Sequence, residues 1–211
     1  MNIRTISWAG NRIKIIDQTK LPGKFEYIYI SGIKALWQAI KELKVRGAPA
    51  LGAAAGLGVY LWAKDSKAEN FREFNQDLEK TAQYIGSSRQ TARNLFWGLE
   101  RMRAAVLKNK NKPLAQIKQV IFKEAQNIIN EDRAACRSIG YFGAKLIKSG
   151  DTILTICNAG ILATIDYGTA LGVIYRAQQD GKRLKVFACE TRPLLQGARL
   201  TAWELHKKGI D

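Results

Sequence analysis

The sequence predicts an α/β protein: a small antiparallel sheet and a helical domain, followed by the start of a Rossmann-like parallel α/β domain. Two observations predict this fold class. Apolar residues recur at helical spacing through the middle of the chain, and from residue 153 onward the pattern becomes strand, helix, strand, helix. Because helices alternating with strands are typical of a parallel sheet, we expect two domains, at 1–148 and 149–211.

The first elements are predicted to form the antiparallel sheet. Residues 12–17 (RIKIID) and 25–30 (FEYIYI) alternate as strands do, and residues 21–23 (LPG) supply a turn between them. A short amphipathic helix should follow at 33–45, and residues 46–49 (RGAP) should end it.

The middle of the chain is predicted to be helical. Residues 48–63 (APALGAAAGLGVYLWA) form the longest nearly apolar run. This run is shorter than the roughly 20 residues that cross a bilayer, so it indicates a buried helix. Three further patterns of helical spacing begin near Phe71, Leu95 and Leu114, and the last continues or kinks toward Ile147.

The C-terminal region is predicted to open a parallel sheet. Its elements are a strand at 153–156, a helix at 163–178, a strand at 184–190 and a helix at 194–208. A third strand should begin at Ile210. Because a parallel sheet of two strands is poorly stable alone, we expect the chain to be a truncated, N-terminal portion of a longer protein.

The composition is that of a folded globular protein with an unusual charge. The 211 residues include 34 basic and 18 acidic side chains, which gives a net charge of +16. An anionic partner, such as nucleic acid or a phosphorylated metabolite, would explain the excess, and so would a solvated lysine-rich surface. The basic run from Arg101 to Lys123 lacks the motifs of a nucleic-acid module, which favours the solvated surface.

The cysteines and the N-terminus indicate a cytoplasmic protein. Cys136, Cys157 and Cys189 are far apart and show no metal-type pairing, which suits a reducing compartment. Basic residues interrupt the N-terminus before an apolar core of signal-peptide length accumulates. We expect no metal site and no membrane partner, and we expect Cys136 and Cys189 in the core.

Cys157 stands where an open α/β sheet binds ligands. It follows the predicted strand at 153–156, and Glu190 ends the next strand, so both are expected at one rim. A helix N-terminus after the thiol would favour the thiolate, with residues 158–160 (NAG) supplying N–H groups. A cysteine between apolar residues can equally be buried, so both interpretations stay open.

The segment 44–52 (KVRGAPALG) is the second candidate site. Arg46 beside Gly47, with a proline at a helix start, offers a cation and free backbone donors to a phosphate. A structural loop with an exposed arginine is the alternative. Arg89 stands in a similar place ahead of a helix, whereas His206 near a helix end is expected to have a surface role.

Five stretches of the sequence, in order, resemble the S-methyl-5-thioribose-1-phosphate isomerase family. They are 17–22 (DQTKLP), 44–52 (KVRGAPALG), 87–97 (SSRQTARNLFW), 153–164 (ILTICNAGILAT) with 166–173 (DYGTALGV), and 190–205 (ETRPLLQGARLTAWEL). The resemblance extends from about Ile6 to the last residue. That family shares a superfamily with the regulatory subunits of a eukaryotic translation initiation exchange factor.

The resemblance implies an aldose–ketose isomerase of methionine salvage. The family converts 5-methylthioribose 1-phosphate to 5-methylthioribulose 1-phosphate without a metal or redox cofactor, and the complete proteins are commonly homodimers. By motif position, Cys157 resembles the catalytic cysteine. The positions that resemble the family's substrate contacts are Arg46, Gly47, Ala48, Arg89 and Gln196.

Two departures from the family pattern bear on activity. Ile156 stands where the family usually carries histidine, and the family's catalytic aspartate and its Asn-Lys pair fall beyond Asp211. Because a positioned acid or base commonly contributes about 10²–10⁴-fold to a rate, we expect these 211 residues to be inactive by themselves.

Three other functions compete with this interpretation. A non-catalytic sugar-phosphate- or nucleotide-binding protein, like the regulatory relatives, would retain Arg46, Arg89 and Gln196, although the intact C-N-A-G at Cys157 favours catalysis. A ribose-1,5-bisphosphate isomerase would need a second cationic pocket. Nucleic-acid binding through the basic surface is the least favoured.

Overall fold

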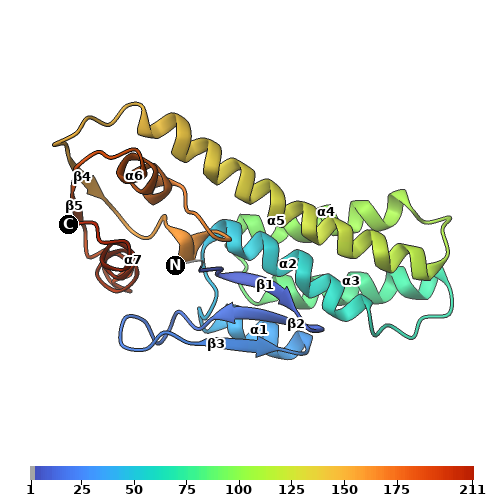
Figure 1. Ribbon diagram of the computed structural model, residues 1–211. Coiled ribbons are helices and arrows are strands. Elements are labelled where there is room, and N and C mark those ends of the chain that lie inside the picture. Colours follow the sequence, from blue (N-terminus) through green and yellow to red (C-terminus); the bar gives the residue numbers. More distant parts are fainter. Residues whose placement is uncertain (1–2) are drawn as a thin grey trace.

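The computed structural model describes residues 3–211, which form an α/β protein with two sheets and seven α-helices (Figure 1). The elements are β1 (Ile6–Ala9), β2 (Arg12–Ile16), β3 (Tyr27–Ile30), α1 (Ile33–Lys41), α2 (Ala48–Ala63), α3 (Phe71–Ser87), α4 (Arg93–Lys108), α5 (Leu114–Ala144), β4 (Thr152–Thr155), α6 (Ala170–Gln179), β5 (Lys185–Ala188) and α7 (Ala202–Lys207). A 3₁₀ turn at Ile161–Ala163 and a π-helical turn at Gly197–Thr201 complete the set. The predicted fold class is confirmed.

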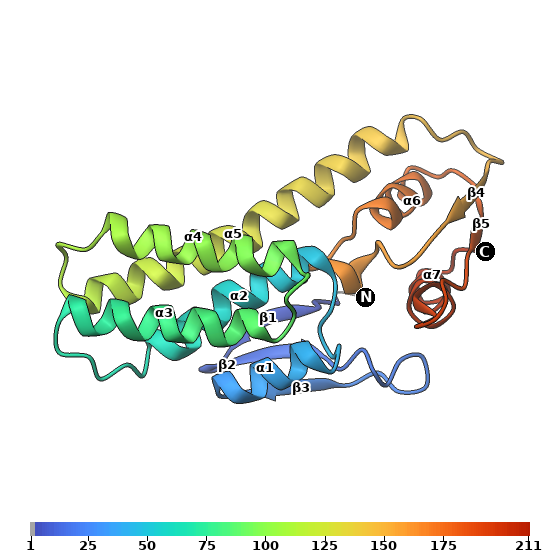
Figure 2. The same ribbon diagram turned by 180° about the vertical axis from the view of Figure 1, so that it is seen from behind.

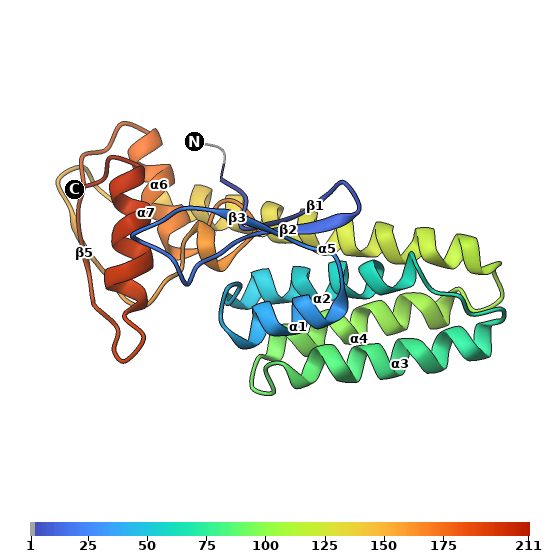
Figure 3. The same cartoon turned by 90° about the horizontal axis from the view of Figure 1, so that it is seen from below.

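The N-terminal sheet is antiparallel in the order β1-β2-β3, as predicted for its last two strands. Alternate side chains face the protein interior, so Ile6, Ile13 and Ile15 are fully buried. Figure 3 shows this sheet edge-on, lying against α1 and α2.

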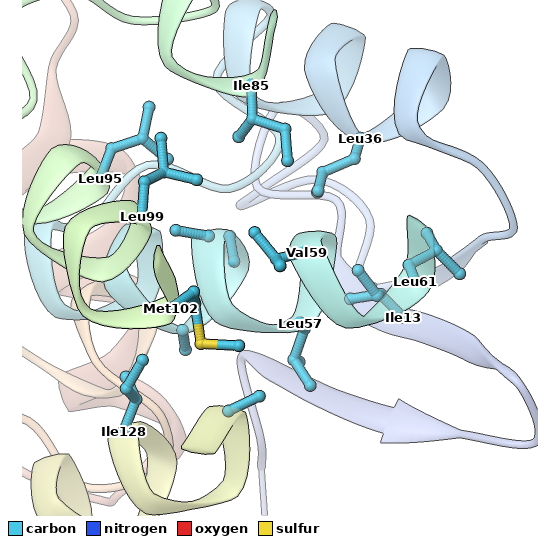
Figure 4. Close-up of a cluster of buried hydrophobic side chains, with 14 of the residues drawn as sticks. Ile13, Leu36, Leu57, Val59, Leu61, Ile85, Leu95, Leu99, Met102 and Ile128 are labelled. Atoms are coloured by element: carbon cyan, nitrogen blue, oxygen red, sulfur yellow. The ribbon is translucent and has the colours of Figure 1, made fainter. Parts of the chain in front are cut away.

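Helix α2 is the centre of the helical part. It is buried over nearly its whole length, as the apolar run predicted, and α3, α4 and α5 pack around it (Figure 2). Leu57 belongs to the same buried cluster as Met102 of α4 and Ile128 of α5 (Figure 4). A Cβ on Gly98 would lie 2.7 Å from the Gly52 carbonyl oxygen, so α2 and α4 approach backbone to backbone. Within residues 3–211, no helix is long and apolar enough to cross a membrane.

The C-terminal part contains the predicted parallel pair, in which β4 and β5 align Thr155 with Ala188. One face of this pair packs with α6 and α7 on a second buried cluster. The other face is open, since Leu154 is 72% exposed and Phe187 is 53% exposed. The Val186 N–H of β5 donates a hydrogen bond to the Asp211 backbone oxygen at 2.8 Å, and the third strand expected from Ile210 stays a prediction.

Three predicted helices differ from the structure. In place of a helix from residue 194, a π-helical turn spans Gly197–Thr201 and α7 itself begins at Ala202. The helix predicted from residue 163 begins at Ala170, because Gly168 at φ +97° and the Thr169 N–H bond to the Ala159 carbonyl turn the chain first. The helix predicted to run to residue 45 ends at Lys41, since Leu43 adopts φ 62°.

The proposed division at residues 148 and 149 stays a prediction. The second buried cluster draws residues from both ends of the chain, because Ile3, Ile16 and Leu21 join Ile161 and Leu200 in it. Arg199 also donates to three N-terminal backbone carbonyls, those of Gln18, Thr19 and Leu21.

Candidate active site

A cavity of about 360 Å³ lies between the start of α2 and the loop that follows β4. Its walls come from four separate parts of the chain. The lining residues are Arg46, Gly47, Ala48, Pro49, Arg89, Cys157, Asn158, Ala159, Ala163, Thr164, Thr169 and Gln196. The structure therefore brings together all six residues that the sequence singled out for catalysis or binding.

The two arginines of the cavity lie side by side. Arg89 Nη1 donates to the Arg46 carbonyl oxygen at 2.7 Å. The Gln196 amide suits its surroundings when its oxygen accepts from Arg46 Nη2 at 2.7 Å and its nitrogen donates to the Thr191 carbonyl at 2.8 Å. Gln196 thus orients the Arg46 guanidinium from across the cavity.

The arginine pair is electropositive and has no acidic partner among residues 3–211. Burial and the neighbouring Arg89 lower the pKa of Arg46 from its ordinary value, whereas the nearby Cys157 raises it. Across the described chain, neither arginine lies within ion-pair distance of a carboxylate. An anionic ligand would supply the missing negative charge.

The start of α2 adds free backbone donors to the arginine pair. The first N–H groups of a helix have no intrahelical acceptor. Among residues 3–211, Gly47 and Ala48 donate no backbone hydrogen bond outside the helix. A helix N-terminus of this kind favours a phosphate or carboxylate.

Gly47 is required by close contact rather than by its backbone angles. Its φ of −63° suits any residue, but a Cβ at this position would lie 2.1 Å from Ala163 Cα and 2.2 Å from the Ala163 carbonyl oxygen. The loop between α1 and α2 (residues 42–47), which we call the arginine loop, therefore meets the loop after β4 backbone to backbone, and both loops line the cavity.

Cys157 is the exposed cysteine, and its backbone is held in a strained conformation. Its φ is 62°, which is uncommon for a residue with a Cβ. Two hydroxyls hold it: the Cys157 N–H donates to Thr191 Oγ1 at 2.8 Å, and Thr201 Oγ1 donates to its carbonyl at 2.5 Å. The predicted helix N-terminus directly after the thiol is absent from this part of the structure, because only the three-residue 3₁₀ turn follows.

The other candidates lie outside the cavity. Cys136 is buried, as predicted, and burial together with Asp132 raises its pKa to about 12. The prediction that Cys189 lies in the core, inside a strand, is wrong, because Cys189 is half-buried and follows the end of β5 at Ala188. Glu190 is exposed and pairs with Arg192 at 3.1 Å, and His206 is exposed on α7.

Sequence reasoning missed the buried carboxylate beside this cavity. Glu204 is 2% exposed and accepts hydrogen bonds from Asn158 and Tyr175. The available signal was a single acidic residue between Trp203 and Leu205, both of which are buried. Among residues 3–211, no three His, Cys, Asp or Glu side chains gather closely enough to hold a metal ion.

The chain is similar in sequence to two named isomerases. It is 53% identical over 208 residues to the 5-deoxyribose 1-phosphate isomerase of Moorella thermoacetica, covering 99% of this chain and 59% of that protein. It is 51% identical over 210 residues to the methylthioribose-1-phosphate isomerase of Citrifermentans bemidjiense, covering 100% of this chain and 61% of that protein. The chain thus spans less than two thirds of these relatives' own lengths.

Two solved structures share the fold. The 5-methylthioribose 1-phosphate isomerase from Pyrococcus horikoshii superimposes with a TM-score of 0.92 at 40% identity, over 99% of this chain and 58% of that one. The translation initiation factor eIF-2B subunit delta from A. fulgidus gives a TM-score of 0.89 at 47% identity, over 99% and 61%. The model of the protein family described as "Initiation factor 2 subunit family" matches residues 44–211. These residues include the whole cavity lining. The chain belongs to the initiation factor 2 subunit family.

Proposed function

We propose that this chain provides the thiol and the anion-binding wall of an aldose–ketose isomerase that acts on 5-methylthioribose 1-phosphate. One observation supports this above the others: the exposed Cys157 shares a cavity with Arg46 and Arg89, which have no carboxylate partner in the described chain. An electropositive pocket beside a thiol suits a phosphorylated substrate that must be held while a neighbouring carbon reacts.

The substrate phosphate would bind at the arginine pair and the start of α2. Both guanidinium groups and the N–H groups of Gly47 and Ala48 are available to its oxygens. Gln196 keeps the Arg46 fork in place through the 2.7 Å contact. The sugar would then extend from C1 toward Cys157.

The reaction needs a ring opening and a hydrogen transfer. The bond between C1 and the ring oxygen breaks, and the ring oxygen gains a proton. One hydrogen then moves from C2 to C1, and the C2 hydroxyl loses its proton to become the ketone. C1 is reduced and C2 is oxidised, so no external oxidant enters. Cys157 would lie beside these carbons, where a thiol or thiolate can exchange a proton or stabilise developing charge.

The charge distribution of the cavity favours a substrate with one phosphate. Its two cations gather at one end, and the rest of the lining consists of glycine, alanine, proline, cysteine, asparagine, threonine and glutamine. A bisphosphate would bring a second charged group to this uncharged wall. The proposed substrate class is therefore a pentose 1-phosphate with an uncharged substituent at C5, such as a methylthio group.

The proposal includes a cytoplasmic, homodimeric enzyme. The three cysteines are unpaired, which agrees with a reducing compartment. The homodimer follows from the family resemblance, and sedimentation velocity at several protein concentrations tests it.

The test begins with binding by this chain. Ribose 1-phosphate should slow the alkylation of Cys157 by iodoacetamide. We call the ligand concentration that halves the alkylation rate the protecting concentration, and Arg46→Ala should raise it by about 10- to 100-fold. Turnover of 5-methylthioribose 1-phosphate should appear when the unmatched portion of the Moorella thermoacetica relative is joined after Asp211. Cys157→Ala in that chimera should abolish turnover. An active Cys157→Ala chimera, or failure of the sugar phosphate to protect the thiol, contradicts the proposal.

A second candidate is non-catalytic binding of a sugar phosphate or nucleotide. The likeness to the eIF-2B subunit delta structure favours it. Protection of Cys157 by ligand without turnover in the chimera would select this function instead.

A further inference from the structure

Glu204 is a buried carboxylate that accepts four hydrogen bonds. Its Oε1 accepts from Asn158 Nδ2 at 2.8 Å and from the Leu162 N–H at 3.2 Å. Its Oε2 accepts from the Ile161 N–H at 2.6 Å and from Tyr175 Oη at 2.9 Å. Three of these four donors belong to residues 157–163, which we call the thiol loop because it begins at Cys157.

The carbonyl groups of Ile161 and Leu162, in the 3₁₀ turn of the thiol loop, are bound by residues on the opposite side. Thr5 Oγ1 donates to the Ile161 carbonyl at 2.6 Å, and Gln18 Nε2 donates to the Leu162 carbonyl at 2.8 Å. The N–H groups of Ile161 and Leu162 are thus held by α7, while their carbonyls are held by the N-terminal segment. The position of this turn is set from both sides.

The held turn lies between the two halves of the cavity. Asn158 and Ala163 line the cavity on the thiol side, and Ala163 contacts Gly47 of the arginine loop. Gly160 leaves room for the carboxylate, since a Cβ there would lie 2.2 Å from Glu204 Oε2. Displacement of the turn would therefore move the thiol and the arginine loop relative to each other.

We propose that Glu204 is a positioning residue, which fixes the thiol loop so that Cys157 and Arg46 face one ligand. This inference rests on the proposed function only in the measurement of ligand protection described below. Glu204 does not touch the cavity, so it acts through Asn158, Ile161 and Leu162. A glutamine cannot replace it, because either orientation of the amide turns its NH₂ toward a backbone N–H of the loop.

The experiment compares the wild-type chain with Glu204→Gln. Hydrogen–deuterium exchange of peptides from the thiol loop should quicken by about tenfold or more in the variant. The concentration of ribose 1-phosphate that halves the alkylation rate of Cys157 should rise by about tenfold. Ile174→Val serves as the matched control, because Ile174 is buried in the second cluster beside Tyr175 and its side chain has no polar atom to bond Glu204. It should lower stability while leaving the protecting concentration within about twofold.

Each outcome decides the inference. Protection by ligand at the wild-type concentration in Glu204→Gln would overturn it and leave Glu204 as a residue of the core. Should Glu204→Gln fail to fold, Tyr175→Phe removes one donor with the ring retained, and an unchanged protecting concentration in that variant overturns the inference.

A failure of the proposed function gives a different pattern. Ribose 1-phosphate would then leave Cys157 unprotected in the wild-type chain. Exchange of the thiol loop and the alkylation rate of Cys157 without ligand would still test Glu204, because Glu204→Gln should change both and Ile174→Val should change neither.

Discussion

Replacement of Gly47 by alanine should damage the site through one contact between two backbones. The new Cβ would lie 2.1, 2.2 and 2.4 Å from the Ala163 Cα, carbonyl oxygen and carbonyl carbon. All three atoms belong to the main chain, so no side-chain rotation relieves the overlap. The φ of −63° at Gly47 suits alanine, which leaves the overlap as the cause of any loss.

Gly32 offers a matched control for the magnitude. It also precedes a helix in extended conformation, but a Cβ there meets nothing within 4 Å. Like Gly47→Ala, Gly32→Ala replaces a helix N-cap glycine, which weakens the cap, and lowers the entropy of the unfolded chain, which stabilises the fold. Each effect is about 0.4–1 kcal/mol, and the two partly cancel. Overpacking costs about 1–3 kcal/mol, so Gly47→Ala should be less stable than Gly32→Ala by that amount.

Urea unfolding monitored by circular dichroism measures the difference in stability between the two variants. Protection of Cys157 by ribose 1-phosphate measures the effect on the site. The Gly47 variant should require about tenfold more ligand, since the arginine loop is pushed away from the thiol loop. Equal stability of the two variants within about 0.5 kcal/mol would refute the reasoning, because the overlap would then have been absorbed without cost.

Three further predictions follow from burial and charge. Leu57→Ala should lower the free energy of unfolding by about 2–5 kcal/mol, measured in urea, because Leu57 is fully buried in α2. Cys157 should be alkylated at pH 8 about 100-fold faster than Cys136, whose pKa is raised to about 12 by burial, and peptide mapping by mass spectrometry distinguishes them. Glu131→Gln should destabilise the protein by about 0.5 kcal/mol at pH 7, since Arg101 lowers the pKa of Glu131 and the ionised carboxylate stabilises the folded state. That difference should vanish in thermal melts as the pH falls through the lowered pKa, and a constant difference would contradict the assignment.

Cys157, Arg46, Gly47 and Arg89 could be predicted from short local patterns, whereas Ala48 and Gln196 came from the family resemblance alone. Residues 153–156 are apolar and β-branched, so they indicated a strand with Cys157 at its carboxyl end. Arg46 and Arg89 each precede a helix start. Their contact, across 43 residues of sequence, could not be read from local spacing and was suggested only by family resemblance.

The support around the cavity was not predictable for the same reason. Glu204 meets its partners across 29 to 46 residues, and no local pattern pairs a carboxylate with distant backbone N–H groups. The late start of α6 depended on the positive φ of Gly168, which a glycine permits but does not require. The local sequence is compatible with more than one conformation at these positions, and tertiary contacts determine which one forms.

The bond from Thr5 to Ile161 and those from Arg199 to the carbonyls near Gln18 set an order in time for the assembly of the site. During synthesis these contacts of Thr5 and Gln18 cannot form until residues 161 and 199 have left the ribosome. Contacts of such wide sequence separation form late and slowly. We therefore expect the thiol loop to be among the last parts to be fixed, and we expect a bulky N-terminal fusion to slow the onset of protection of Cys157 from iodoacetamide more than it destabilises the helical core.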